Sequence, residues 1–420
     1  MKKYDEYKDS GVAWIGEVPK HWEVLRGKYV LNILSGFPFD SQKFEFEDNG
    51  VYMPLIRIRD INGSSTEVYY SGSYPIESVV KTGEVLIGMD GDFNISKWKG
   101  TNALLNQRVC KLREDSSMNT HYAFYMLSSP LKAINSVTYA TTVKHLSVYD
   151  IYNAFIPVPP ISEQTAIATY LDTHCAKIDN LISIQQKRIA LLQELKQSVI
   201  THAVTKGLNP NVEMKQSGVE WIGDVPKHWK VLRGKYALSI LSGFPFDSQK
   251  FEFEDNGVYM PLIRIRDING SSTEVYYSGS YPIESVVKTG EVLIGMDGDF
   301  NISKWKGTNA LLNQRVCKLR EDSSMNTHYA FYMLSSPLKA INSVTYATTV
   351  KHLSVYDIYN AFIPVPPISE QTAIASYLDR KCATIDTSIS NAQHQIDLLQ
   401  EYKQSLITEV VTGKRKVTDN

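Results

Sequence analysis

Short alternating apolar segments predict a β-rich domain near the start of the chain. Residues 51–58, 84–88 and 107–112 alternate apolar and polar positions or are rich in β-branched side chains, so each is predicted to be a strand. Turn signals such as Asn62-Gly63 and Asp90-Gly91 separate them. Residues 119–126 instead have helical spacing. Together these patterns predict a mixed α/β domain.

A long helix is predicted to follow this domain. The Pro159-Pro160 pair forbids helix and is predicted to form a hinge. Ser162 is placed to cap a helix, with Glu163 in its first turn. Neither proline nor glycine occurs from there to about Thr205. Forty-odd helical residues at about 1.5 Å each would give a rod of roughly 60 Å.

The predicted helix carries an apolar stripe at close to heptad spacing, and a second helix near the end of the chain carries another. Two such rods in one chain can bury their stripes against each other and hold two domains at a fixed distance. The stripes are Ile178, Leu181, Ile182, Ile189, Leu192, Leu195 and Val199, and Ile385, Ile389, Ile396, Leu399, Tyr402 and Leu406.

The whole pattern occurs twice. The segment that begins at Gly11 returns at Gly218, and residues 33–168 are identical to residues 240–375. The copies differ most in the helices that follow. Each repeat is far longer than a solenoid unit, so the chain is a tandem domain duplication. An enzyme seldom needs two identical complete sites, whereas a protein that recognises a two-part target does.

Composition narrows the function. A chain of 420 residues suggests at least two domains, and 43% hydrophobic with 21% charged residues is typical of a globular protein. The net charge of −1 means that any DNA binding must come from a local basic surface or from partners. No apolar run is long enough to cross a bilayer, and the polar start is no secretory signal, so a cytoplasmic location is expected.

Signatures of catalysis are missing from the sequence. There is no phosphate-binding GxxxxGK[ST] loop and no GxGxxG after a strand. Asp90, Asp92 and Lys97 could be taken for a nuclease metal site, but the neighbouring glycines favour a surface loop. His21 and His228 lie next to tryptophans, which favours structural packing over base catalysis. The four cysteines, spaced unlike metal ligands, are expected to be buried reduced thiols.

Three segments mix the basic, amide and hydroxyl side chains that bond base edges and phosphates. The first segment (57–63) offers Arg57, Arg59 and Asn62, the second (94–108) offers Asn94, Lys97, Lys99, Gln107 and Arg108, and the third (139–146) offers Thr141, Thr142, Lys144 and His145. The second copy repeats them as Arg264, Arg266, Asn269, Asn301, Lys304, Lys306, Gln314, Arg315, Thr348, Thr349, Lys351 and His352.

Each of these three segments also has a simpler explanation. The first can be a solvated strand end in which an arginine pairs with an aspartate. The second can be a solvated loop with Trp98 in the core, and the third an ordinary helix cap. The duplication gives weight to the DNA-binding interpretation.

These features together resemble the specificity subunit of type I restriction–modification enzymes. Trp14-Ile15-Gly16, Val18-Pro19 and His21-Trp22 open each half. Each half closes with Leu146-Ser147, the string Ile156-Pro157-Val158-Pro159-Pro160-Ile161-Ser162-Glu163-Gln164, then Ile167-Ala168 and Leu171-Asp172. The resemblance covers nearly the whole chain.

The resemblance implies α/β (α+β) target-recognition domains at 1–160 and 208–367, called here the first and second heads. Helical spacer regions at 161–207 and 368–420 would form an antiparallel coiled coil, with the heads in a pseudo-twofold tandem repeat. It also implies that the chain is not itself an enzyme. Double-stranded DNA, two modification (methyltransferase) subunits and restriction motor-nuclease subunits would be its partners. S-adenosylmethionine, ATP and Mg would be bound by those partner subunits.

Members of this family usually carry two different heads, but here the heads are identical over a long run. With a pseudo-twofold arrangement, identical heads predict a split-palindromic DNA site with an adenine in each half. A stand-alone methyltransferase or nuclease and a purely structural coiled-coil protein are the alternatives.

Overall fold

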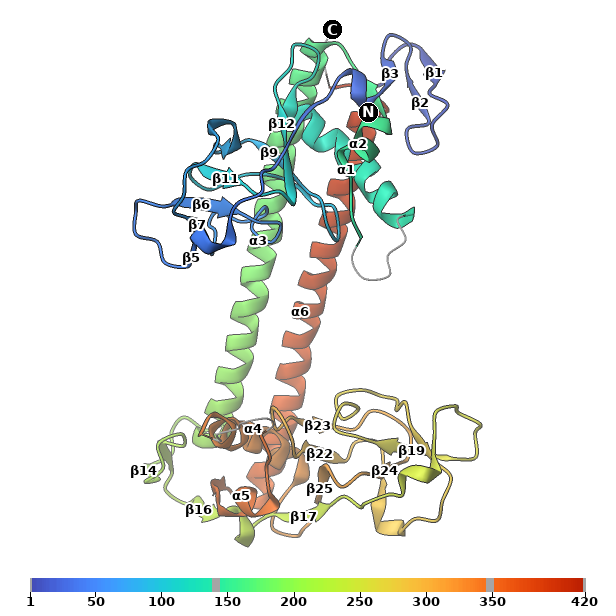
Figure 1. Cartoon of the computed structure of the whole chain (residues 1–420). Coiled ribbons are helices and arrows are strands. Elements are labelled where there is room, and N and C mark those ends of the chain that lie inside the picture. Colours follow the sequence, from blue (N-terminus) through green and yellow to red (C-terminus); the bar gives the residue numbers. More distant parts are fainter. Residues whose placement is uncertain (1, 138–143, 345–350, 418–420) are drawn as a thin grey trace. The chain divides into compact units, whose positions relative to one another are not determined.

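The computed structural model describes residues 2–137, 144–344 and 351–417, which form two compact units (Figure 1). The first unit comprises Met1–Gln185 with His394–Asn420, and the second comprises Gln186–Gln393. Each unit therefore holds one head, the beginning of the long helix that follows it, and the end of the other long helix. Both units are built in the same way.

The heads contain short strands and two helices each. In the first unit the strands are β1 (Tyr7–Asp9), β2 (Glu17–Pro19), β3 (Glu23–Arg26), β4 (Asn32–Ser35), β5 (Phe44–Glu45), β6 (Met53–Ile56), β7 (Tyr69–Tyr70), β8 (Val79–Val80), β9 (Val85–Gly88), β10 (Ile95–Lys97), β11 (Ala103–Leu105), β12 (Val109–Arg113) and β13 (Phe155–Val158). Its helices are α1 (Thr120–Val137) and α2 (Val148–Asn153).

The second head repeats this order. Its strands are β14 (Met214–Gln216), β15 (Asp224–Pro226), β16 (Lys230–Arg233), β17 (Ser239–Ser242), β18 (Phe251–Glu252), β19 (Met260–Ile263), β20 (Tyr276–Tyr277), β21 (Val286–Val287), β22 (Val292–Gly295), β23 (Ile302–Lys304), β24 (Ala310–Leu312), β25 (Val316–Arg320) and β26 (Phe362–Val365). Its helices are α4 (Thr327–Val344) and α5 (Val355–Asn360), and the two long helices are α3 (Ile161–Lys206) and α6 (Ile368–Val411).

Each head is layered around a central antiparallel sheet. In the first unit this sheet has the order β10-β9-β12-β4, and a second sheet has the order β5-β7-β6-β11-β8. Ile87 and Cys110 of the central sheet pack with α1 on one face. Leu86 and Val109 pack with the second sheet on the other face. Burial on both faces explains why β9 is a continuous apolar run rather than an alternating one.

The predicted strands and the predicted helix of the head are confirmed as β6, β9, β12 and α1, with small shifts at their ends. The helix α1 continues past the predicted residue 126 and through Pro130, because Leu127 and Leu131 extend its buried face.

The proline-rich segment lies between a strand and the long helix. Residues 155–158 form β13, which pairs antiparallel with β3, and Pro159 and Pro160 connect it to α3 without helix, so their action as a hinge stays a prediction. The predicted cap at Ser162 is wrong. The amide of Gln164 donates to the carbonyl of Pro160 at 3.0 Å, so α3 begins at Ile161. Glu163 does lie in the first turn, as predicted.

Within each unit the two long helices run antiparallel. In the first unit Lys403 pairs with Asp179 at 2.6 Å, and in the second the equivalent Lys196 pairs with Asp386 at 2.7 Å. The predicted stripe is only partly confirmed. Ile178, Ile385, Ile396 and Leu406 are buried, but Leu181, Leu195 and Tyr402 are exposed because two helices alone cover only a narrow seam.

The four cysteines are free and buried, as expected. None of the helices that the structure describes combines the length and the apolar character needed to cross a membrane.

Gly36 provides a test of this packing. Its amide donates to the carbonyl of Val109 at 2.9 Å, and a Cβ here would overlap the backbone of Asn106. We expect Gly36→Ala with Gly243→Ala to cost about 1–3 kcal/mol per head and to lower the thermal midpoint by several degrees. The neighbouring exposed pair Ser35→Ala with Ser242→Ala is the control. Equal midpoints for the two variants would contradict the packing described here.

Candidate nucleic-acid interface

The first two recognition segments meet at one edge of the head. Strands β6 and β11 are parallel neighbours, pairing Ile56 with Leu105, so the residues that follow them lie side by side. The amide of Asn106 donates to the carbonyl of Ile56 at 3.3 Å. Arg57 and the turn at residues 106–108 therefore project from the same edge.

The end of β9 lies at this edge as well. A Cβ on Gly88 would lie 3.1 Å from the side chain of Ile58, and the Gly88 amide donates to the carbonyl of Asn94 at 2.8 Å. The next amide, that of Met89, donates to the carbonyl of Arg108 at 3.0 Å. The end of β9 thus bonds both ends of the second segment and lies next to the first.

The third segment is tied to the same place. His145 Nδ1 lies 2.6 Å from Asp90 Oδ1, and the amide of Leu146 donates to the carbonyl of Met89 at 2.7 Å. Arg108 contacts the same carboxylate at 3.5 Å. Lys144 instead bonds the backbone carbonyl of Asn135 at 2.6 Å. The second head repeats the central contact, with His352 at 2.7 Å from Asp297.

The structure therefore gathers many of the predicted residues on one edge of each head. Asn94, Asn62, Gln107, Arg108 and His145 are exposed there or next to it. Their base or phosphate contacts stay a prediction. Thr141, Thr142, Thr348 and Thr349 lie outside the described residues.

The arginines of the first segment are held in ion pairs. Arg57 contacts Glu67 at 2.9 Å, and Arg59 contacts the same carboxylate at 3.2 Å. In the second head Arg264 pairs with Asp267 at 3.2 Å. The arginine–acid pair that the sequence left open is therefore present. Since Glu67 is exposed, each contact is worth only about 0–1 kcal/mol, so DNA could displace it at little cost.

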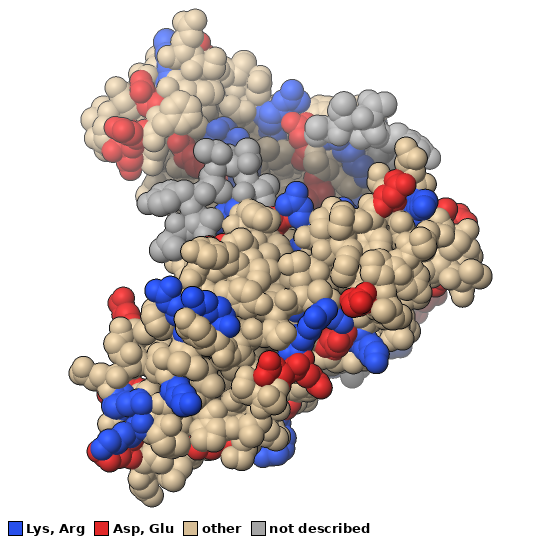
Figure 2. All heavy atoms as spheres, turned by 90° about the horizontal axis from the view of Figure 1, so that it is seen from below, with Lys and Arg blue, Asp and Glu red and all other residues tan. Residues whose placement is uncertain are grey.

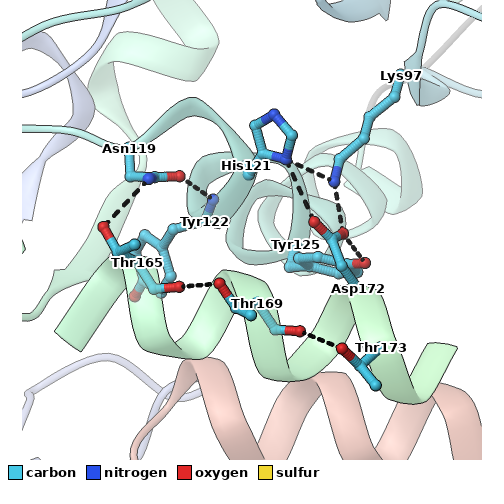
Figure 3. A network of polar contacts seen from close by, with 9 residues as sticks. All are labelled: Lys97, Asn119, His121, Tyr122, Tyr125, Thr165, Thr169, Asp172 and Thr173. Carbon is cyan, nitrogen blue, oxygen red and sulfur yellow. Dashed lines mark hydrogen bonds and ion pairs between the residues drawn. The ribbon is translucent and has the colours of Figure 1, made fainter. Parts of the chain in front are cut away.

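Lys97 lies away from this edge, at the far end of β10 (Figure 3). Its Nζ is 2.6 Å from Asp172 Oδ1 on α3 and 3.0 Å from His121 Nδ1 on α1. Its neighbour Trp98 is buried and donates to the carbonyl of Thr101, while Lys99 is exposed. A DNA contact by Lys97 remains a prediction, but in this structure its ammonium is bound within the protein.

The group around Asp172 joins the head to the long helix. The Tyr125 hydroxyl donates to Asp172 Oδ1 at 2.6 Å, and His121 lies 3.3 Å from Asp172 Oδ2 (Figure 3). Desolvation acts to raise the pKa of Asp172, but hydrogen bonds from Lys97 and Tyr125 outweigh it and hold that pKa below its usual value. Lys304, His328, Tyr332 and Asp379 form the same group in the second unit.

A second junction uses Glu163 in the first turn of α3. Its carboxylate accepts from the Trp22 indole at 3.0 Å and the Tyr4 hydroxyl at 3.0 Å, and lies 2.7 Å from His21 Nε2. Trp22 is fully buried. His21 and Trp22 therefore help to fasten the first head to the start of α3.

Sequence reasoning missed the Asp172 junction. The available signal was that Tyr170-Leu171-Asp172 returns unchanged as Tyr377-Leu378-Asp379, just after the identical block ends, in a part of the helices where many positions differ. Charged side chains at both ends of a junction look like ordinary surface residues until the tertiary contact is known.

The described residues contain no cluster of three or more His, Cys, Asp or Glu side chains that could hold a metal ion. Burial raises the pKa of the Cys110 thiol to about 12, so it is no nucleophile near neutral pH. Over the face shown in Figure 2, basic and acidic side chains are interspersed.

Comparison with known proteins gives a consistent result. The family model "Type I restriction modification DNA specificity domain" matches residues 19–194 and 227–396. The specificity subunit of the type I restriction enzyme EcoBI from Escherichia coli is 29% identical, over 94% of this chain and 86% of that protein. The MjaVIII specificity subunit from Methanocaldococcus jannaschii is 26% identical, over 95% of this chain and 94% of that protein.

One solved structure supports the fold. It comes from work on the assembly and conformational transition of the type I R-M system, and it covers 94% of this chain and 98% of its own. Its TM-score is 0.71 at 18% sequence identity.

The Asp172 junction makes a prediction about stability. Asp172→Asn with Asp379→Asn leaves Lys97 and Lys304 without a carboxylate partner. We expect the free energy of unfolding to fall by about 1–2 kcal/mol per unit. This lies low in the range for hydrogen bonds to a charged group, because 40% of the Asp172 side chain is exposed. Urea unfolding at neutral pH measures this loss, and Thr173→Ala on the same helix is the control.

The pH dependence of the loss follows from the direction of the pKa shift. A lowered carboxyl pKa contributes stability that is complete above the ordinary value of 3.8 and is lost as the pH falls through the lower folded value. The advantage of the wild type over the asparagine variant should therefore vanish in strong acid. A difference that does not change with pH would contradict the role of the ionised carboxylate.

Proposed function

Because the chain belongs to the family of type I restriction–modification DNA specificity domains, we infer that it is the DNA-recognition subunit of a type I restriction–modification complex. The observation that carries this inference is that the family model matches twice, and each match spans a head together with the start of its long helix. The chain assembles with other subunits of such a system and binds DNA. Its relatives are named specificity subunits rather than methyltransferases or nucleases.

We propose that the DNA site is bipartite and that its two halves have the same sequence in inverted orientation. The residues of the candidate interface at the edge of each head are identical in the two heads, and they make corresponding contacts. Arg108 lies 3.5 Å from Asp90, and Arg315 lies 3.5 Å from Asp297. Two surfaces with the same side chains in the same local geometry should select the same bases.

The long helices support the inverted arrangement. Each unit uses the start of one long helix and the end of the other, and the two segments run antiparallel. The exchange is reciprocal, so each head is attached to the helix pair in the same way. We propose that the helix pair sets the length of the unread spacer between the half-sites.

The remaining components are proposed to lie on partner subunits. Two modification subunits would bind S-adenosylmethionine and methylate an adenine in each half-site. Motor-nuclease subunits would bind ATP and Mg and carry out restriction. The complex would act in the cytoplasm, where its DNA is found.

Methylation mapping tests the proposed function. The chain, co-expressed with its modification subunits, should methylate adenine in a split palindrome, and the purified chain alone should neither methylate nor cut DNA. Activity of the chain alone would contradict its assignment as a recognition subunit. Two unrelated half-sites would contradict the identical-head proposal while leaving DNA recognition intact.

A pair of single substitutions sharpens this test. Arg108→Gln changes only the first head, and Arg315→Gln changes only the second. If both heads recognise the same half-site in inverted orientation, each variant should relax one half of the motif, and the two altered motifs should be reverse complements of one another. The double variant should relax both halves. Two altered motifs that are not reverse complements of one another would contradict the proposal.

A further inference from the structure

Two basic residues of each head differ from the predicted DNA-binding arginines. Arg57, Arg59, Lys97 and Arg108 each contact a carboxylate. Arg26 and Lys28 are exposed, and neither has a carboxylate partner within the described part of the chain. Their equivalents in the second head, Arg233 and Lys235, are likewise exposed and have no carboxylate partner among the described residues.

Arg26 and Lys28 are nevertheless positioned by aromatic and amide groups. The guanidinium of Arg26 lies 5.2 Å from the centre of the Phe155 ring and donates to Asn153 Oδ1 at 3.2 Å. The ammonium of Lys28 lies 4.8 Å from the centre of the Tyr29 ring. The distances for Arg233 and Lys235 in the second head are 5.4 Å, 3.4 Å and 4.9 Å. Cation–π contacts orient a cation without neutralising its charge.

The backbone between the two cations is also fixed. The amide of Gly27 donates to the carbonyl of Ala154 at 2.9 Å, and a Cβ on Gly27 would lie 2.6 Å from the carbonyl of Ile151. A glycine is therefore required for this close approach to α2. Arg26 and Lys28 flank this fixed stretch of backbone at Gly27, so both cations are positioned before any ligand binds.

We call this surface the aromatic–basic patch. It comprises Arg26, Lys28, Tyr29, Tyr149, Asn153 and Phe155, and in the second head Arg233, Lys235, Tyr236, Tyr356, Asn360 and Phe362. Its aromatic rings are largely open to solvent, Tyr149 being 74% exposed.

The aromatic–basic patch adjoins the candidate interface. An open hollow of about 750 Å³ has Arg26, Tyr149, Asn153 and His145 among its lining residues. His145 also contacts Asp90, which pairs with Arg108. The surface is therefore continuous from the predicted base-contacting residues to the unpaired cations.

Carboxylates near the patch are already engaged. Asp150, which lines the hollow, accepts from the amide and the hydroxyl of Ser147 in a capping box. Asp90 contacts His145 and Arg108. Neither Arg26 nor Lys28 forms an ion pair with these carboxylates, so both cations stay available to a ligand, although the whole chain has a net charge of −1.

We propose that the aromatic–basic patch of each head binds the phosphate backbone of the DNA duplex next to the half-site. This inference rests on the proposed function and goes beyond it, because it names a second binding surface that grips DNA without recognising bases. Exposed guanidinium, ammonium, amide and phenol groups are the donors that phosphate oxygens accept from. Two exposed cations without an ion pair, next to the candidate interface, favour a polyanion such as DNA as the occupant.

Salt dependence of DNA binding tests the patch. The complex of the chain with its modification subunits is compared, as wild type and as the Arg26→Gln/Arg233→Gln variant, for binding to a duplex with the methylated site and to an unrelated duplex. Losing about one phosphate contact per head should make the negative slope of log K against log salt less steep by roughly 2. The ratio of wild-type to variant affinity should accordingly shrink about tenfold between 50 and 200 mM salt. Both duplexes should be affected alike, and the methylation motif should not change.

The control removes the same charge elsewhere. Lys81→Gln with Lys288→Gln takes one exposed lysine from each head, just before β9 and β22 and at the opposite end of those strands from the candidate interface. Its salt slope should equal that of the wild type. Arg26→Lys with Arg233→Lys should retain most of the slope, and Lys28→Gln with Lys235→Gln serves as a second test if the glutamine variant of Arg26 does not fold.

The possible outcomes separate the two proposals. An unchanged salt slope in a folded Arg26→Gln/Arg233→Gln variant overturns the inference. If that variant instead loses its modification subunits, the patch is a protein-docking surface and the inference is equally overturned. If the wild-type complex binds neither duplex, the proposed function fails rather than the inference about the patch.

Discussion

Each unit depends on the last turns of a long helix that begins in the other unit. In the first unit Leu406, Ile407, Val410 and Val411 of α6 are buried in the core of the head that starts the chain. Burying four such side chains contributes on the order of 10 kcal/mol, which is comparable to the whole stability of a domain. The buried Tyr122 hydroxyl donates to the carbonyl of Pro157 at 2.8 Å and lies 3.4 Å from that of Val411. In the second unit Ala203 and Val204 of α3 take the same places, and Tyr329 contacts Val204 at 3.3 Å. Neither head can therefore form its full core without the other half of the chain.

This exchange explains which parts of the repeat differ. The helices differ mainly where they face solvent. Where they complete a head the replacements stay apolar, as with Val410 and Ala203, and the contacts that join the two helices are kept. The ion pair Lys403–Asp179 therefore has an exact counterpart in Lys196–Asp386. The amide–lysine contact between Gln404 and Lys132 likewise recurs between Gln197 and Lys339. Between these points the sequences differ, because a partly exposed helix surface tolerates many side chains.

Local patterns predicted the elements, and long-range contacts decided the site. The apolar run of β9 and the uninterrupted helix of α3 could be found from sequence because each depends on neighbouring residues. The pairing of β13 with β3 could not be predicted, because Pro157 and its strand partner Val24 are far apart in the sequence. Arg57, Asp90, Arg108 and His145 come together only through the pairing of separate strands and loops. Lys97 looked like a DNA contact because its carboxylate partner lies on the long helix, 75 positions away. Arg26 and Lys28 gave no signal, since two cations among apolar residues are ordinary in sequence and become distinctive only when the structure shows that neither forms an ion pair.

The contrast between paired and unpaired cations suggests how a nearly neutral chain can bind DNA selectively. In the proposed interface Arg57 and Arg108 must each exchange a carboxylate contact for a base edge or phosphate. The displaced Glu67 or Asp90 then lies close to DNA, and its negative charge penalises any sequence that does not return a compensating bond. Paired arginines therefore add discrimination but little net attraction. Arg26 and Lys28 have no such carboxylate to displace, so they attract any duplex, whatever its sequence. Separating the two tasks over adjoining surfaces lets the heads hold DNA through a few uncancelled charges while selectivity stays with residues whose charge is already balanced.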